Sequence, residues 1–560
     1  MLNFIIGRNN SGKTEKIRAL IAERASENKK CILIVPEQFS FESERSILEK
    51  IGAQKMLNVD ILSFTRLAFV INEQYGKALN KTIDDGTRKV LMSLSLEALS
   101  GKLEYFKRFS SKPALLSNLL TFVTELKQCA VTPDEIAEIS GKTGNKSLGK
   151  KLSELSLIAA SYDALVSRSF FDDENLLTIA ADMISETDFF DGKAVYFDAF
   201  CGFTKQERNC IKSILPKAEN VFISLCTDRD SSREGVSVFE NVNSEFSHLK
   251  ECAAEQNVGV SSPEILNVKE DGRSPELVYL EKYLCGEESE PYKEDCDNIV
   301  VCAAGNRADE ADFVACEIKK LLRCNPTLRC RNIAVIERTA GTYDKELSES
   351  FKKYGVPMFE DKRRPIGIQP VMVFVKCLLA LCAESFSTES FMRLLKTGLT
   401  ALSGDEISEL ENYAFLWNID GSKWRRDFTE NPDGLGFDVT EKSQEKLIRL
   451  NDIRKRSVLP VLAFKKDFEE ADGEKKSRLI YEFLIKNGVT ERLREKIEYL
   501  VSSGDTVLCE EQDTVWATLM DMLGKMASAI GETVITAKRY SELFNILLSA
   551  VTLGSLPQEL

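Results

Sequence analysis

One stretch near the N-terminus has the residues and the spacing of a phosphate-binding loop. It reads Gly7-Arg8-Asn9-Asn10-Ser11-Gly12-Lys13-Thr14 and fits the pattern G-x-x-x-x-G-K-[ST]. Its glycines let the backbone wrap closely around phosphates, and the amides that open the following helix point toward them. In this pattern the lysine meets the β- and γ-phosphates, while the hydroxyl of Thr14 binds Mg²⁺. The stretch therefore predicts an ATP–Mg²⁺ site.

Such a loop also needs an acidic residue on a second strand to complete the magnesium shell. Asp198 is the best candidate, because it ends the apolar run Val195-Tyr196-Phe197. In working ATPases a glutamate usually follows and activates water, but here the next residue is Ala199, which cannot accept a proton. We therefore expect nucleotide binding without efficient hydrolysis, and we assign no catalytic residue. The alternative is that Asp198 ends its strand without any nucleotide role.

The segments around these residues alternate as they do in a parallel α/β sheet. Short apolar runs at 2–6, 31–35 and 58–62 are each followed by a helical pattern. Helical periodicity then continues through about 84–186, and apolar strand patterns return at 194–200 and 220–226. Strands that read as continuous apolar runs are typical of a sheet covered by helices on both faces. The sequence thus predicts one α/β domain that is interrupted by a helical insertion.

A second α/β unit is predicted further along the chain. The runs NIVVCAA (298–304) and RNIAVIER (331–338) have the pattern of strands, and a helical pattern separates them. We therefore predict an α/β fold of two nucleotide-fold domains, each with a largely helical insertion. The expected ranges are 1–83 with 187–295 for the first domain, 84–186 for its insertion, 296–385 for the start of the second domain, and 386–560 for the second insertion.

Composition excludes several kinds of chemistry. The 560 residues include 74 Lys+Arg and 88 Asp+Glu, and the resulting charge of −14 disfavours indiscriminate nucleic-acid binding but permits a local basic channel. His248 is the single histidine, so histidine triads and multi-histidine metal sites are nearly excluded. No C-x-x-C spacing occurs among the fifteen cysteines, which favours reduced thiols. No apolar run reaches membrane-spanning length and no signal peptide is recognisable, so we expect a cytoplasmic protein without a membrane partner.

Several motifs together resemble one protein family. In chain order they are GRNNSGKT (7–14), VPEQFSFESE (35–44), DILSFTRLAF (60–69), YFDAFCGFTKQE (196–207) and RNIAVIERTAGTYDKEL (331–347). Their content and order resemble AddB, a subunit of the AddAB helicase–nuclease, which is a relative of RecBCD and processes broken double-stranded DNA ends for recombination. The resemblance implies a UvrD-like superfamily 1 arrangement of two RecA-like domains with helical insertions.

The resemblance also implies partners and DNA-binding residues. In that family an AddA-type motor subunit forms a heterodimer with AddB, whose degenerate helicase region scans the unwound single strand for the hotspot Chi. Segments that follow the second and third strands line the single-strand channel. The residues at these positions here are Gln38, Ser40, Phe64, Arg66, Phe69 and, after the Asp198 strand, Phe203. Aromatic rings stack on bases and arginine pairs with phosphate. The alternative for the three phenylalanines is a place in the core.

The resemblance finally predicts what this chain lacks. AddB proteins continue past LGSLP (553–557) into the rest of the second domain and into a nuclease domain that holds an iron–sulfur cluster. We therefore expect a chain truncated before those parts, with neither nuclease activity nor cluster. The predicted function is the helicase-like region of an AddB-type subunit, which binds single-stranded DNA and ATP and acts in DNA repair by recombination. The alternatives are a self-sufficient P-loop ATPase or DNA helicase, and an assembly scaffold that uses neither ligand.

Overall fold

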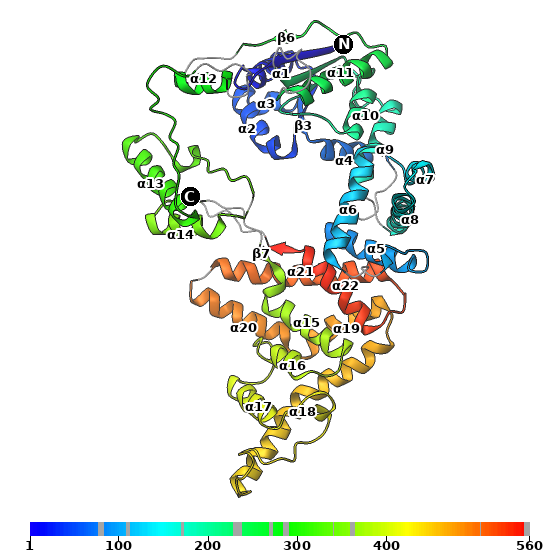
Figure 1. Cartoon of the computed structure of the whole chain (residues 1–560), viewed down its shortest axis with the longest axis vertical. Helices are drawn as coiled ribbons and strands as arrows, with labels where there is room; N and C mark the ends of the chain where they lie inside the picture. Colours follow the sequence, from blue (N-terminus) through cyan, green and yellow to red (C-terminus); the bar gives the residue numbers. More distant parts are fainter. Residues whose placement is uncertain are drawn as a thin grey trace. The chain divides into compact units, whose positions relative to one another are not determined.

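The computed structural model divides into two compact units (Figure 1). The first comprises Met1–Val268 and Pro365–Leu553, and the second comprises Lys269–Arg364 and Gly554–Leu560. The residues described are 1–76, 83–107, 112–169, 173–227, 238–267, 273–283, 291–339, 341–358, 364–504 and 506–553.

The first unit is built on a six-stranded parallel sheet, which confirms the predicted α/β class (Figure 1). Its strands lie in the order β3-β2-β4-β5-β1-β6. They are β1 (Leu2–Gly7), β2 (Cys31–Ile34), β3 (Val59–Leu62), β4 (Ala194–Phe197), β5 (Asn220–Cys226) and β6 (Glu264–Ile265). In the register, Leu2 pairs with Val221, and Cys31 pairs with both Val59 and Ala194. Because these strands are parallel, all their carboxyl ends lie at one edge of the sheet.

Side chains alternate between the two faces of the sheet, and helices cover both faces. In β1, Phe4 and Ile6 belong to the core on one face, whereas Ile5 belongs to the core on the other. The first face packs on α4 (Phe64–Tyr75), α9 (Asp173–Glu186), α10 (Lys205–Ile214) and α11 (Glu240–Glu255). The second face packs on α1 (Lys13–Ser26), α2 (Ser40–Ile51) and α3 (Ala53–Met56). Burial on both faces explains why the strands are continuously apolar.

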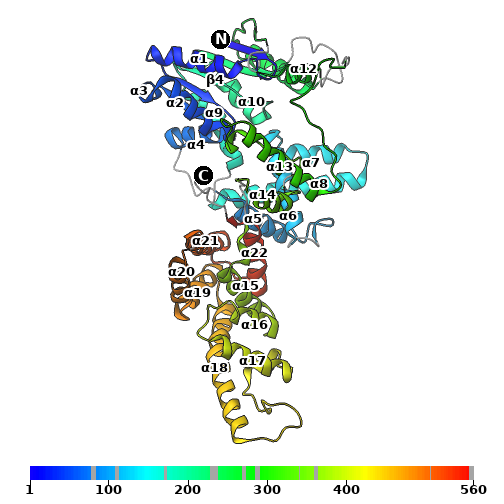
Figure 2. The same ribbon diagram turned by 90° about the vertical axis from the view of Figure 1, so that its left-hand side faces the viewer.

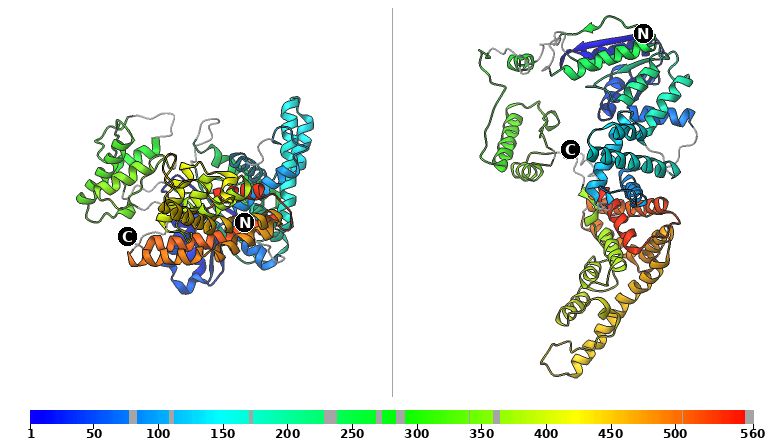
Figure 3. Two further views of the ribbon diagram at one scale, coloured as in Figure 1. Left: turned by 90° about the horizontal axis from the view of Figure 1, so that it is seen from below. Right: turned by 45° about the vertical axis from the view of Figure 1, so that its right-hand side comes forward.

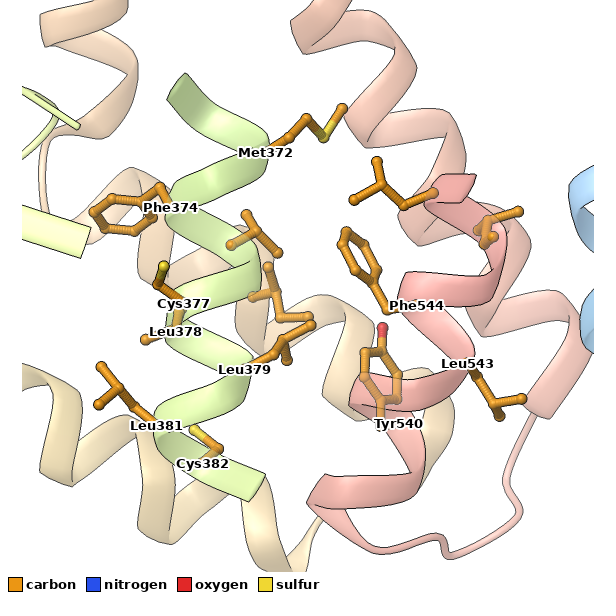
Figure 4. Packing of buried hydrophobic residues seen from close by; sticks show 14 of the residues in the cluster. Met372, Phe374, Cys377, Leu378, Leu379, Leu381, Cys382, Tyr540, Leu543 and Phe544 are labelled. Carbon is orange, nitrogen blue, oxygen red and sulfur yellow. The ribbon is translucent and has the colours of Figure 1, made fainter. Parts of the chain in front are cut away.

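Helices from two distant parts of the sequence share a single hydrophobic core. One part supplies α5 (Asp85–Ala98), α6 (Pro113–Gln128) and α8 (Lys146–Ser169). The other part supplies α15 (Pro370–Ala383), α18 (Glu441–Glu470), α21 (Thr506–Ile530) and α22 (Ala537–Ala550). Figure 4 shows part of this core, where Leu379 of α15 lies near Tyr540 and Phe544 of α22. We expected one helical insertion in each of two domains. In the structure, both helical regions and α15 contribute to one core.

The remaining helices of the first unit extend this core. They are α7 (Pro133–Lys142), which packs on α8, and α16 (Thr388–Leu395), α17 (Gly404–Leu416), α19 (Gly473–Lys486) and α20 (Val489–Ser502). The two-residue strands β7 (Arg364–Pro365) and β8 (Thr552–Leu553) pair with each other. Figures 2 and 3 show that α17 and the first part of α18 project beyond α15 and α16.

The second unit contains α12 (Pro275–Tyr283), α13 (Arg307–Cys324) and α14 (Asp344–Tyr354). Its small core includes Ala315 and Ile318 of α13 and Phe351 of α14. The runs at 298–304 and 331–338, for which we predict strands, form none: Val301 and Ile336 are 94% and 90% exposed, and Cys330–Asn332 is a 3₁₀ turn. A strand needs a neighbour that completes its backbone hydrogen bonds, and the described part of this unit supplies none beside them. A second RecA-like sheet is therefore not confirmed.

The thirteen cysteines whose side chains the structure describes are free thiols. Burial raises the pKa of Cys31 to about 11 and that of Cys382 to about 12, so both are protonated and weakly nucleophilic at neutral pH. His248 is exposed on α11. None of the helices in the described ranges is long and apolar enough to cross a membrane.

Candidate functional site

The predicted phosphate-binding loop, residues 7–14, joins β1 to α1 and has a tightly curled backbone. A Cβ atom at Gly7 would lie 2.3 Å from Ser11 Oγ and 2.7 Å from the Leu266 carbonyl oxygen, so only glycine fits there. Gly12 caps α1 with a φ of 88°, a left-handed conformation that glycine adopts without strain. Between them, the Ser11 amide donates a hydrogen bond to the Arg8 carbonyl oxygen at 3.3 Å. The loop thus brings its backbone to the amino end of α1, where an anion is favoured.

The predicted phosphate ligands lie on this loop. The Lys13 ammonium donates hydrogen bonds to the carbonyl oxygens of Gly7 at 2.9 Å and of Arg8 at 2.7 Å. The Arg8 guanidinium lies 5.4 Å from the centre of the Phe239 ring at the start of α11. Thr14 is partly exposed in the first turn of α1. Two cations and the amides of a helix start therefore surround one small region, which is the chemistry of a phosphate site.

Asp198 lies at the same edge of the sheet, directly after β4. It is 5% exposed, and its amide donates to the Ile34 carbonyl oxygen at 3.1 Å. The Ser224 hydroxyl of β5 donates a hydrogen bond to its carboxylate and so fixes its orientation. Since β5 lies between β1 and β4, Asp198 is two strands away from the phosphate-binding loop. Ser224 is not among the residues predicted from the sequence, although a hydroxyl inside the apolar run NVFISLC is a recognisable signal.

These residues fit a nucleotide that carries a magnesium ion. The Thr14 hydroxyl and the Asp198 carboxylate are the oxygen donors that Mg²⁺ prefers, and the ion usually keeps several waters and phosphate oxygens as further ligands. Within the described ranges no group of three His, Cys, Asp or Glu side chains could hold a metal ion by itself. A bound magnesium–nucleotide would supply the polarised phosphates, while Ala199, with a φ of 64°, occupies the position where a hydrolytic carboxylate would stand.

The segments that follow β2 and β3 adjoin each other at this edge. Arg66 of α4 lies 4.0 Å from Glu44 of α2, measured between the charged atoms. Ser63 caps α4 by accepting a hydrogen bond from the Arg66 amide at 3.1 Å, which fixes the turn after β3. On the β2 side, Gln38 is exposed and Ser40 is partly exposed. The structure thus brings the predicted polar residues of the two segments onto neighbouring surface.

The three predicted aromatic contacts fall into two groups. The rings of Phe64 and Phe203 are each 6% exposed and lie 6.1 Å apart, centroid to centroid, in a cluster with Phe197 and Phe200. Neither ring has an open face for a base. These two residues therefore lie in the core, which is the alternative to DNA stacking that the sequence allows. Phe69 is 41% exposed on α4 and remains available for stacking.

Two exposed rings that are not among the predicted residues neighbour Gln38 and Ser40 along the chain. Phe41 is 78% exposed at the start of α2, and Phe39 precedes it with a partly open ring. In PEQFSFESE the two aromatic residues alternate with polar ones after a buried strand, but local spacing alone does not determine whether such rings are exposed. Phe41, Phe69 and Arg66 are therefore open aromatic and cationic residues on the two helices that follow β2 and β3, and Arg66 approaches α2 at Glu44.

The six-stranded parallel sheet with helices on both faces defines an α/β protein. The chain belongs to the AddB family: residues 4–281 match the family model described as "ADDB, N-terminal". Three similar proteins each carry a name that makes them a subunit of an ATP-dependent helicase/deoxyribonuclease. They are those of Acetivibrio thermocellus (29% identical), Clostridium acetobutylicum (28%) and Thermoanaerobacter sp. strain X514 (29%), and each match covers 100% of this chain and 50%, 49% and 49% of the relative. The chain spans about half the length of the curated relatives it matches.

Proposed function

We propose that this chain is the helicase-like region of an AddB-type subunit, acting in the repair of DNA double-strand breaks by recombination. In this role the edge of the sheet binds single-stranded DNA beside α2 and α4 and binds ATP–Mg²⁺ beside α1. The observation that carries the proposal is that the phosphate-binding loop, Asp198 and the exposed surface of Phe41, Arg66 and Phe69 all follow carboxyl ends of one parallel sheet. The names of the relatives support it.

The chemistry of the exposed surface fits a scanned single strand. Rings such as Phe41 and Phe69 stack on any base, and the Arg66 guanidinium pairs with phosphate or stacks as well. Gln38 and Ser40 add donors and acceptors that can read base edges, which is what recognition of a hotspot sequence such as Chi requires. Buried Phe64 and Phe203 then support this surface from beneath.

Replacing Phe41 by alanine should weaken the binding of a labelled single-stranded oligonucleotide about 5- to 150-fold, because one base stack contributes about 1–3 kcal/mol. Arg66→Ala should weaken binding as well and should lower the slope of log affinity against log salt by about 1, since one phosphate contact is lost. Fluorescence anisotropy at several salt concentrations measures both effects.

Tyr499→Ala and Arg494→Ala are the matched controls for these two variants. Both residues are exposed on α20, away from the sheet, and Tyr499 is about as open as Phe41. Their replacement should leave DNA affinity unchanged. Wild-type affinity in both Phe41→Ala and Arg66→Ala would contradict the proposed DNA surface.

The magnesium part of the proposal has its own test. Asp198→Asn keeps an acceptor for the Ser224 hydroxyl but removes the charge that attracts the cation. We expect wild-type protein to bind ATP more tightly with Mg²⁺ than with a chelator, and the variant to lose about tenfold or more of that gain. Asp60→Asn removes an exposed carboxylate on β3 and should keep the full gain in ATP affinity with Mg²⁺. If Mg²⁺ raises the ATP affinity of Asp198→Asn as much as that of the wild type, Asp198 is not part of the magnesium site.

Strand scanning requires a motor that this site does not provide. With Ala199 in place of the water-activating acid, no observation favours a self-sufficient ATPase or helicase. We therefore also propose a heterodimer with an AddA-type motor subunit that moves broken DNA past this surface.

A further inference from the structure

A carboxylate lies on the surface proposed for DNA, next to Arg66. The Glu44 side chain on α2 is 44% exposed, and its Oε1 lies 4.0 Å from a guanidinium nitrogen of Arg66 on α4. Protein groups that contact DNA phosphates are cations, amides and hydroxyls, whereas a carboxylate repels phosphate. Glu44 is therefore either a simple ion-pair partner of Arg66 or a contact to the bases of the strand.

The ion pair leaves the hydrogen-bonding groups of both side chains available. Its separation of 4.0 Å is longer than a charge-assisted hydrogen bond, which joins such atoms at about 2.7–2.9 Å. Among the described residues, no other group forms a hydrogen bond with the Glu44 carboxylate or the Arg66 guanidinium. An exposed ion pair at this distance contributes little to the stability of a fold. Both charged groups can therefore bind a ligand.

Each of the two charged residues has an open aromatic ring beside it on its own helix. Phe41 precedes Glu44 by three positions on α2, and Phe69 follows Arg66 by three positions on α4. Helical residues three positions apart are neighbours on one side of the helix. Because Glu44 and Arg66 approach each other, a base that stacks on either ring lies close to the charged pair.

Guanine is the base that matches a carboxylate best. Its Watson–Crick edge presents two adjacent donors, N1–H and N2–H, which fit the two oxygens of one carboxylate. Cytosine and adenine offer a single amino group beside an acceptor nitrogen, and thymine offers one N–H between two carbonyl oxygens, so a carboxylate meets a repulsive atom in each case. A single strand leaves this edge open for recognition. Bidentate hydrogen bonds to a charged group are strong and directional.

We propose that Glu44 selects guanine in the bound single strand, with its two carboxylate oxygens accepting hydrogen bonds from N1–H and N2–H. The rings of Phe41 and Phe69 hold this base or its neighbour by stacking. Arg66 offsets the charge of Glu44, so the phosphate backbone can approach. The inference rests on the proposed function and deepens it, because the surface then prefers one base instead of binding single strands in general.

The test uses short labelled oligothymidylates whose central nucleotide is thymine, guanine, adenine or cytosine, with binding measured by fluorescence anisotropy. The wild type should bind the guanine strand about 5- to 150-fold more tightly than the other three, the discrimination expected from one bidentate contact. Hypoxanthine in place of guanine lacks the 2-amino group and should lose part of this preference. Glu44→Gln should lose most of it and should bind the thymine strand at least as tightly as the wild type, because a repulsive charge is removed.

Glu49→Gln is the matched control, because Glu49 is an exposed carboxylate of the same helix and pairs with Arg45 at 3.0 Å. It changes the charge equally and should keep the preference for guanine. Equal binding of the four strands by the wild type, or a guanine preference that Glu44→Gln retains, would overturn the inference, while Phe41→Ala judges the DNA surface separately. A preference for adenine or cytosine that Glu44→Gln abolishes would overturn the assignment of guanine. No binding of any strand would overturn the proposed DNA surface as well.

Discussion

Replacing Lys13 by alanine should lower the affinity for ATP–Mg²⁺ about 100-fold. The Lys13 ammonium donates to neutral acceptors, the carbonyl oxygens of Gly7 and Arg8 and the Ser11 hydroxyl, and charged phosphate oxygens at the same place are stronger acceptors. Loss of charge-assisted hydrogen bonds to the phosphates costs about 3 kcal/mol, which corresponds to the expected factor. Titration with a fluorescent ATP analogue in the presence of Mg²⁺ measures the change.

Lys16→Ala is the control for this variant. Lys16 lies one turn further along α1 and pairs with Glu264 at 2.7 Å, so its removal changes the charge equally without touching the loop. ATP affinity should stay at the wild-type value, and both variants should melt at similar temperatures. Single-stranded DNA affinity should also stay unchanged in Lys13→Ala. Equal ATP binding by wild type and Lys13→Ala would contradict the nucleotide proposal and leave the DNA surface to be judged separately.

Trp424→Ala should destabilise the helical core by about 3–5 kcal/mol, the usual cost of removing a fully buried large aromatic side chain. The Trp424 ring is fully buried and lies 4.9 Å from the Phe391 ring and 5.8 Å from the Phe428 ring, centroid to centroid. Its indole also donates a hydrogen bond to the Thr388 hydroxyl at 2.8 Å. The truncation leaves a cavity and removes that bond. Urea unfolding followed by circular dichroism measures the shift of the midpoint.

Trp424→Phe separates the two contributions at this position. Phenylalanine keeps most of the ring contacts but cannot donate to Thr388, so we expect a clearly smaller loss than for alanine. Trp417 is a comparison position for the fully buried Trp424, because its side chain is only partly buried and packs at the side of the core. An alanine variant at Trp424 as stable as the wild type would mean that this part of the core does not hold the helices together.

The sequence predicted the position of the loop at residues 7–14 more completely than the surface proposed for DNA. The phosphate-binding loop is a local pattern whose strand and helix are its immediate neighbours, so residues 7–14 could be placed directly. In the α4 segment, periodicity could have separated the phenylalanines, because Phe64 shares the buried spacing of Leu67, Ala68 and Ile71 whereas Phe69 does not. The exposure of Phe41 depends instead on how α2 lies on the sheet, which local spacing does not determine.

Two further features of the fold differ from the prediction because they depend on segments that are distant in the sequence. The apolar runs at 298–304 and 331–338 have strand patterns, but a strand forms only where a neighbour completes its backbone hydrogen bonds. Likewise, an apolar stripe on α5 or α22 predicts burial without naming what buries it. The shared core of the two helical regions therefore could not be predicted, although the helical pattern of each region was clear.

The shared core also determines when the chain can finish folding during its synthesis. Arg539 of α22 pairs with Glu97 of α5 at 2.9 Å, although the two residues are 442 positions apart in the sequence. At translation rates of about 5–20 residues per second, roughly 20–90 s pass between the appearance of the two helices. During that interval α5 can pack on α6 and α8, but the part of its apolar surface that α22 covers stays exposed until the late helices leave the ribosome.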